Sequence, residues 1–378
     1  YRGPADAVLA VFGSRSSGPL GGAVSGRGGA GRVPVVILCN HYRSWTAEEK
    51  AAADRTTQVM VDGLRGLGHR VEVAEFWKAP APALRRFSPA EWVVFNWCEG
   101  VEDEVGGEAR VCAELEAMGY TYTGNPPDTL ALSAEKGQVK RALERAGIAT
   151  PPGGEVQVLA EVTPELAARC GFPAIVKPVR QHCSIAINHD AVVCDLAQLR
   201  RRVQYVLEEV KEPALVERFV VGREINVGVW GNERPRVLPL REIDFSRIAN
   251  PLHRVLTWDG KWDPGSGDFQ ATPVIARPEV SPRLQRRIEE VALATYRALG
   301  CRDYARFDLR IDADERPWVV DFNPNPDITP EGGFAGACAA AGYSYAEAVS
   351  HIVAMATARR ELPVRAFAHE RRRSVGVG

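Results

Sequence analysis

The residues with the clearest chemical meaning lie in a predicted β-hairpin, residues 304–323, towards the C-terminal end of the chain. Side chains alternate between the two faces of a strand, so Arg306 and Asp308 share one face of the hairpin. Asp321 and Asn323 on the return strand are predicted to share that same face. Three oxygen ligands without His or Cys suit Mg²⁺, and a neighbouring Arg suits a developing anion. The hairpin therefore predicts a magnesium site, although a solvated polar sheet face has the same pattern.

The opposite face of this hairpin is apolar and is predicted to cover a hydrophobic core. The side chains assigned to that face are Phe307, Leu309 and Ile311 on the first strand and Val320 and Phe322 on the return strand.

Lysine is scarce in this chain, which gives each lysine some weight as a candidate. Of the 47 Lys and Arg residues, only seven are Lys. Lys136 opens a predicted helix, and Lys177 ends the short apolar strand Pro173–Lys177. Lys261 lies in a Gly- and Asp-rich stretch, residues 258–269, which is predicted to be either a lid or an ordinary surface loop.

In this order and at this spacing, these segments resemble the D-alanine–D-alanine ligase branch of the ATP-grasp family across residues 120–350. The matching stretches are Tyr122–Gly124, Ser133–Lys136, Val176–Pro178, Glu217–Glu224, Leu299–Cys301, Tyr304–Asp308, Asp321–Pro326 and Ala339–Gly342. The resemblance implies an α/β fold of the ATP-grasp type.

The resemblance also implies an ATP site, with its residues carried over position by position. The nucleotide-binding set is Lys136, Lys177, Ser184, Glu217, Phe219, Val220, Glu224 and Lys261. Lys136 and Lys177 would bind the α- and β-phosphates, and Lys261 would reach the γ-phosphate. The segment Glu217–Val220 would frame the adenine, and Glu224 would hold the ribose.

The metal and catalytic roles follow from the same resemblance. Asp308, Asp321 and Asn323 would hold two Mg²⁺ ions, with Mn²⁺ as an alternative. Arg306 and Lys261 would be catalytic, because Arg306 would stabilise the tetrahedral intermediate and Lys261 the transferring phosphoryl group.

The implied activity is that of an ADP-forming ligase, which joins a carboxylate to an amine through an acyl-phosphate. Its partners would be a small-molecule acid and a small-molecule amine, such as amino acids or peptides, and relatives of this type form homodimers. A ligase for a peptide or another larger acid is a variant of this hypothesis. The alternative is a nucleotide-binding ATP-grasp protein with a regulatory or scaffold role and little catalysis.

The phosphate and metal sites depart from the family pattern at two places. The loop at residues 180–186 has no Gly, whereas the family uses Gly there to bring backbone amides close to the phosphates. Asp321 stands where the family more often has Glu.

The segments that would recognise substrates also differ from the family pattern. Cys39–Ser44 replaces a Gly-rich segment whose Glu meets a substrate amine, and Asp327 stands where a small residue is usual. Gly332 or Gly333 replaces the Ser that meets the carboxylate of the second substrate. D-alanine is therefore not expected to be either substrate.

Four other side chains have more than one interpretation. Arg43 and His41 would either meet an acidic substrate or be solvated loop residues. His182 and His189 are predicted to be surface histidines rather than ligands.

The alternation of strands and helices predicts the fold class and its division. The apolar run Val33–Leu38 is typical of a buried parallel strand, and Ile185–Asn188 is predicted as a strand of the central subdomain. The predicted parts are a Gly/Ser/Arg-rich tail (1–32), a Rossmann-like parallel-sheet domain (33–126), a small β-rich ATP-binding subdomain (127–220), a larger α+β subdomain with the metal and catalytic residues (221–365) and a basic tail (366–378).

Bulk properties exclude some classes of partner. A formal net charge of -1 gives no reason to expect nucleic acid, and no segment is apolar enough to predict a membrane span. None of the eight Cys residues has Cys-x-x-Cys spacing, which favours free thiols in a reducing compartment. With no secretory signal in the sequence given, a cytoplasmic location is expected.

Overall fold

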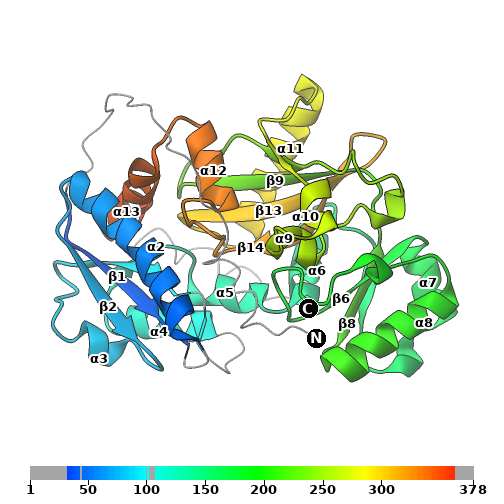
Figure 1. Ribbon diagram of the computed structural model, residues 1–378, viewed down its shortest axis with the longest axis horizontal. Coiled ribbons are helices and arrows are strands. Elements are labelled where there is room, and N and C mark those ends of the chain that lie inside the picture. The colour runs from blue at the N-terminus through cyan, green and yellow to red at the C-terminus, as the bar shows by residue number, and fades with distance from the viewer. Residues whose placement is uncertain (1–31, 43–44, 99, 102–106, 362–378) are drawn as a thin grey trace, which may run out of the picture.

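The computed structural model describes residues 32–42, 45–98, 100–101 and 107–361. The predicted tails, apart from Arg32, and the candidate Arg43 lie outside these residues. Three β-sheets lie side by side, and the sheet that comes last in the sequence lies between the other two (Figure 1). None of the helices in the described ranges has both the length and the apolar character that a bilayer span requires.

The first sheet is parallel, with the strand order β2-β1-β3-β4. Its elements are β1 (Val35–Asn40), α2 (Ala47–Gly66), β2 (Val71–Phe76), α3 (Ala81–Leu84), β3 (Val93–Trp97), α4 (Gly107–Ala117) and β4 (Thr121–Tyr122). Every residue of β1 is buried, as expected for an apolar central strand of a parallel sheet. The Thr46 hydroxyl accepts a hydrogen bond from the backbone N–H of Glu49 (3.3 Å) and starts α2 with a capping box. The predicted parallel sheet is confirmed.

The second sheet is antiparallel, with the order β5-β8-β6-β7. The elements of this part are α5 (Pro127–Ser133), α6 (Lys136–Arg145), β5 (Gly153–Val156), α7 (Pro164–Cys170), β6 (Ala174–Pro178), β7 (Val192–Val193), α8 (Leu196–Tyr205), which ends in a π-helical turn at Val206–Val210, and β8 (Ala214–Arg218). Apolar side chains from α7 and α8 pack on this sheet and form its own core.

The third sheet has the order β12-β11-β9-β13-β14, with β10 paired to β9. The elements here are β9 (Arg223–Trp230), β10 (Arg236–Val237), β11 (Arg241–Ile243), α9 (Trp258–Trp262), α10 (Gly267–Ala271), β12 (Val274–Ala276), α11 (Pro282–Ala298), β13 (Tyr304–Ile311), β14 (Pro317–Asn323), α12 (Gly333–Ala340) and α13 (Tyr345–Glu361). Helix α11 covers one face of the sheet with Leu284, Ile288 and Ala292. The other face forms the floor of the functional site, and Phe334 of α12 packs beside Gly228 on that face.

The hairpin β13–β14 differs from its predicted pattern at one position. Phe307 and Leu309 are buried, as alternation predicts. A β-bulge after Asp308 shifts the register of β14, so that Val319 lies opposite Leu309 and packs in the core. The prediction that Val320 faces the core is therefore wrong, because the bulge turns it towards the cavity described below.

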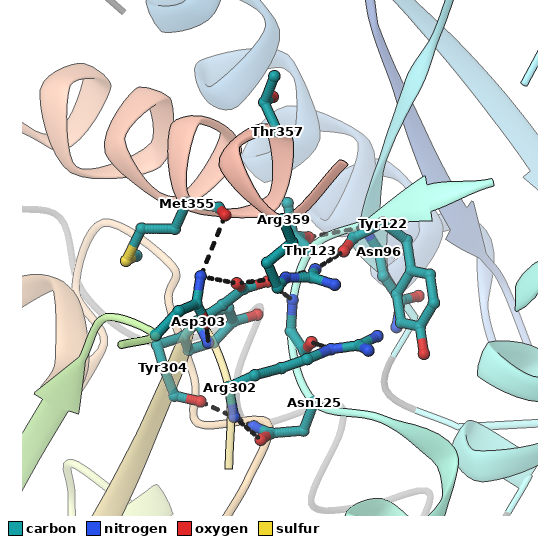
Figure 2. Close-up of polar contacts among 12 residues, drawn as sticks. Asn96, Tyr122, Thr123, Asn125, Arg302, Asp303, Tyr304, Met355, Thr357 and Arg359 are labelled. Carbon is teal, nitrogen blue, oxygen red and sulfur yellow. Dashed lines mark hydrogen bonds and ion pairs between the residues drawn. The ribbon is translucent and has the colours of Figure 1, made fainter. Parts of the chain in front are cut away.

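Helix α13 packs on α2 and on the first sheet, although it follows the third sheet in the sequence (Figure 1). A buried polar network fixes this arrangement, as Figure 2 shows. Asp303 has no solvent exposure and accepts hydrogen bonds from the Gly124 backbone N–H (2.9 Å) and the Asn232 side chain (3.1 Å). Arg359 of α13 donates two more to the same carboxylate (2.9 and 2.8 Å). Asp303 thus links the first sheet, the third sheet and α13.

We expect Asp303→Asn to lower the free energy of unfolding by about 3 kcal/mol, because the buried carboxylate that pairs with the half-buried Arg359 guanidinium is lost. The unfolding midpoint in urea measures the loss. Glu116→Gln is a matched control, since Glu116 pairs with Arg302 at 3.5 Å but is 45% exposed, and it should cost less than about 1 kcal/mol. Equal midpoints for the two variants would contradict the structural role of Asp303.

Candidate active site

A cavity of about 1530 Å³ lies between the second and third sheets and extends towards the first. All of the side chains that the sequence nominated as nucleotide, metal or catalytic residues line it. They are Lys136, Lys177, Ser184, Glu217, Phe219, Val220, Glu224, Lys261, Arg306, Asp308, Asp321 and Asn323. Residues spread over nearly 190 positions of sequence therefore meet in one place.

The third sheet supplies the floor of the cavity as cross-strand rows. Directly opposed residues of antiparallel strands point to the same face. One row runs across the sheet as Arg241, Asn226, Asp308 and Asp321. The row on one side of it contains Gly228, Arg306 and Asn323, and the row on its other side contains Ile243, Glu224 and Arg310. This register explains why the predicted metal ligands and Arg306 lie together.

Asp308 and Asp321 lie directly opposite each other in this floor. Asp308 accepts two hydrogen bonds from Arg306 (2.9 and 3.1 Å), one from Asn226 (2.9 Å) and a long one from Asn323 (3.4 Å). Like charges placed opposite each other on a sheet repel, so a cation between the two carboxylates is favourable. Two carboxylates and the Asn323 amide oxygen are hard donors and fit Mg²⁺.

Asp321 is held in its charged form. Burial opposes the charge, but the neighbouring Lys136, His182 and Lys177 outweigh burial and lower the pKa of the carboxyl below its usual value. Within the described ranges, no three His, Cys, Asp or Glu side chains are grouped as metal ligands. A metal ion here would therefore depend on Asp308, Asp321, the Asn323 oxygen and non-protein oxygens such as phosphate and water.

A buried lysine–glutamate network forms the opposite wall. Glu217 is 3% exposed and pairs with Lys177 at 3.3 Å and with Lys140 at 3.0 Å. Lys177 also donates to the carbonyl oxygen of Val320 (3.2 Å), which connects β6 to β14. Sequence reasoning missed Lys140, although its rarity and its place one helical turn after Lys136 were available signals.

Lys136 lies at the start of α6 and donates a hydrogen bond to the carbonyl oxygen of Gln181. Burial lowers the pKa of its ammonium group, and the charge of Lys177 adds to this effect, while Asp321 opposes it. A nearby anion would restore the preference for the charged form. The position therefore favours a phosphate group between the two lysines.

A second charged pair lies at the far end of the floor. Glu224 pairs with Arg310 at 3.4 Å, and the Arg310 guanidinium lies 4.9 Å from the centre of the Phe219 ring. Burial raises the pKa of the Glu224 carboxyl, which Arg310 partly offsets. The sequence analysis gave no role to Arg310.

The loop after β6 is built without Gly yet adopts backbone conformations that favour Gly. Cys183, Ser184 and Ala186 have φ values of 58°, 61° and 58°. These left-handed residues form a turn, so the predicted strand Ile185–Asn188 is wrong. Each such residue costs on the order of 1 kcal/mol, and strain of this kind is often found at functional sites.

Helix α9 closes over this loop and carries Lys261 into the cavity. The Trp262 indole donates to the carbonyl oxygen of Cys183 (3.1 Å), and the Trp258 backbone N–H donates to that of Ile187 (3.2 Å). The stretch predicted as a lid or a surface loop is therefore attached to the loop after β6, residues 180–186, which is the predicted phosphate loop.

The histidines lie in three different environments, and His182 differs from its prediction. His182 lines the cavity and is not a surface residue, and the charge of Lys136, with burial, lowers its pKa to about 4. His189 pairs at 3.3 Å with Asp268, which belongs to the stretch of residues 258–269. His41 lies outside the cavity lining, between Asp54 (3.1 Å) and Glu75 (3.0 Å), so the structure does not place it at a substrate.

Comparison with known proteins gives a consistent result. Residues 150–354 match the family described as D-ala D-ala ligase C-terminus. The uncharacterised protein y4sG of Sinorhizobium fredii is 30% identical over 81% of this chain and 88% of its own length. A D-alanine–D-alanine ligase of Desulforudis audaxviator is 32% identical over 68% of this chain and 79% of its own.

The fold is also found in solved structures. The D-alanine–D-alanine ligase of Bacillus anthracis, complexed with ATP, superposes with a TM-score of 0.66 and 21% identity. That alignment covers 87% of this chain and 98% of the other.

Proposed function

Because this chain belongs to the D-alanine–D-alanine ligase-like family of ATP-grasp proteins, we propose that it activates a carboxylic acid with ATP as an acyl-phosphate and transfers the acyl group to an amine. One observation carries the proposal. The acidic pair Asp308–Asp321 faces Lys136 and Lys177 across a single cavity, which Arg306 and Lys261 also line. Such an arrangement fits a metal-bound triphosphate beside a reacting carbonyl group.

The protein groups divide the work of the reaction. In the first step the substrate carboxylate attacks the γ-phosphorus, and ADP leaves. The cations of Lys136, Lys177 and Lys261 offset the charge of the phosphates during this transfer. Mg²⁺, held by Asp308, Asp321 and Asn323, would polarise the phosphate oxygens.

In the second step the amine attacks the acyl carbon and phosphate leaves. Arg306 stabilises the oxyanion that forms, because its charge is fixed and it lies beside the cross-strand row that contains Asp308 and Asp321 (the metal row). Contacts of α9 with the phosphate loop exclude water, which would otherwise hydrolyse the acyl-phosphate.

D-alanine is not expected to be the acid or the amine, so the test uses mixed substrates. ATP turnover with Mg²⁺ is followed as ADP and phosphate together, across pools of D- and L-amino acids and dipeptides. ADP release that requires both an acid and an amine is expected. ATP bound without turnover in any pool would instead favour the regulatory nucleotide-binding alternative, which the strained loop without Gly supports.

We expect Lys177→Met to weaken ATP binding by roughly 10- to 100-fold, because a half-buried cation next to the phosphates is removed. Isothermal titration with Mg-ATP measures the change. Lys211→Met is the matched control, since Lys211 is an exposed lysine before β8 that does not line the cavity. ATP affinity equal in the two variants would contradict the phosphate assignment.

A further inference from the structure

Asp327 is a carboxylate in the cavity wall to which the proposed phosphate and metal chemistry gives no role. It lies between β14 and α12, and its Oδ1 accepts a hydrogen bond from the Thr329 backbone N–H (2.8 Å). In the described part of the chain, its other carboxylate oxygen has no hydrogen-bond or ion-pair partner. Oδ1 of Asp327 is therefore held by the backbone, and Oδ2 is available to a ligand.

The backbone next to Asp327 leaves room for this carboxyl group. A Cβ atom on Gly332 would lie 2.9 Å from both Cγ and Oδ1 of Asp327, and 2.6 Å from its backbone oxygen. Any other residue at position 332 would therefore displace Asp327. A Cβ atom on the next residue, Gly333, would lie 3.8 Å from Nη1 of Arg306. The Asp327 carboxyl and the Arg306 guanidinium thus each lie next to one of two adjacent glycines.

The charges agree with this geometry. Burial opposes the charge of Arg306, but Asp308, Asp321 and Asp327 together raise its pKa above the usual value. Asp308 and Asp321 lie opposite each other on β13 and β14, whereas Asp327 lies in the loop between β14 and α12. A carbonyl group bound to Arg306 would therefore lie near the proposed metal ligands and also near Asp327.

An aliphatic amine must lose a proton before it can attack the acyl carbon. Aliphatic amines are ammonium ions near neutral pH, and an ammonium ion has no lone pair with which to attack a carbonyl carbon. A carboxylate with one available oxygen can first bind the ammonium group and then accept a proton from it. The amine nitrogen adds to a face of the planar carbonyl group, and Asp327 lines the same cavity as Arg306, which would hold the oxygen of that carbonyl group.

We propose that Asp327 binds the ammonium group of the acceptor and acts as its general base, so that the acceptor is an aliphatic amine that arrives as a cation. This inference rests on the ligase activity proposed above. An N–H bond of the ammonium breaks and its proton passes to Oδ2 of Asp327. The nitrogen lone pair forms the C–N bond, and the C–O bond to phosphate then breaks, with its electron pair leaving on phosphate. The second proton that the nitrogen loses passes to this leaving phosphate. Asp327 returns its proton to solvent after the product leaves.

The test compares two nucleophiles in Asp327→Asn, which keeps the side-chain volume and an oxygen acceptor for Thr329. The reaction contains ATP, Mg²⁺ and pooled D- and L-amino acids, and amide products are followed by mass spectrometry. A parallel reaction adds hydroxylamine, which is uncharged near neutral pH and traps an acyl-phosphate as a hydroxamate without needing a base. Glu331→Gln, on the same loop but exposed, is the matched control.

In Asp327→Asn, amide formation at neutral pH is expected to fall by about 100-fold, with hydroxamate formation unchanged. The loss should shrink as pH rises, because the fraction of free amine increases about tenfold per pH unit below the amine pKa. Glu331→Gln should behave as the parent protein does.

Two outcomes would overturn the role of Asp327. One is amide formation at the parental rate in Asp327→Asn at neutral pH. The other is an equal loss of amide and hydroxamate that high pH does not restore, which would place Asp327 in the fold or in the first step. If the parent protein forms neither product, the ligase proposal itself fails, and the base assignment fails with it.

Discussion

Arg306→Met is expected to slow amide formation by about 100- to 1000-fold while leaving ATP affinity unchanged. The guanidinium donates two hydrogen bonds to Asp308 and lies on the cavity floor next to the metal row. Removing it takes away the cation that would meet the oxyanion of the tetrahedral intermediate. Single-turnover amide formation and titration with Mg-ATP separate the two effects.

Two further variants make this test specific. Arg306→Lys keeps the positive charge but not the two-pronged geometry, so it should have intermediate activity. Arg316→Met changes an exposed Arg at the turn of the same hairpin, which packs on Trp318, and should be as active as the parent protein. Full amide formation in Arg306→Met would exclude the oxyanion role.

Asp321→Asn should raise the Mg²⁺ concentration needed for half-maximal turnover by at least about 10-fold, because one of two facing carboxylates is lost. Metal-free ATP should bind the variant no more weakly than the parent protein, since a negative charge next to the phosphates has been removed. A general defect in folding would weaken both.

Paramagnetic Mn²⁺ gives a readout that does not depend on activity. Its binding in the presence of ATP can be followed by electron paramagnetic resonance for Asp321→Asn and for Asp314→Asn, an exposed carboxylate at the hairpin turn. Only Asp321→Asn is expected to lose affinity. Equal Mn²⁺ affinity in the two variants would remove Asp321 from the metal site.

Local patterns were enough to predict strands of the first sheet and the polar face of the hairpin, whereas the nucleotide-site candidates came from the family resemblance. The apolar run of β1 and the alternation within β13 each depend on neighbouring residues, and both agree with the structure. Of the seven Lys residues, the three that the resemblance assigned to the phosphates, Lys136, Lys177 and Lys261, all line the cavity.

Features set by a single inserted residue or by distant contacts could not be predicted in this way. The bulge beside Asp308 breaks the two-residue period, so the assignment of Val320 to the core failed. Ile185–Asn188 has apolar residues typical of a strand, but the left-handed residues before and within it turn the chain.

Tertiary contacts account for the remaining misses. Lys140 becomes part of the site because it pairs with Glu217, which lies 77 residues away. His182 was expected at the surface because no sequence pattern shows that its loop folds back over Lys136. Both assignments required the fold.

The claim that the acid is activated by phosphoryl transfer can be tested with an isotope. The acid found in the pooled assay is prepared with ¹⁸O in both carboxylate oxygens, and the phosphate released during amide formation is analysed by mass spectrometry. Attack of the carboxylate on the γ-phosphorus followed by C–O cleavage predicts one ¹⁸O atom in each phosphate. Unlabelled phosphate, released together with amide, would show that the acid never forms an acyl-phosphate and would contradict the proposed function.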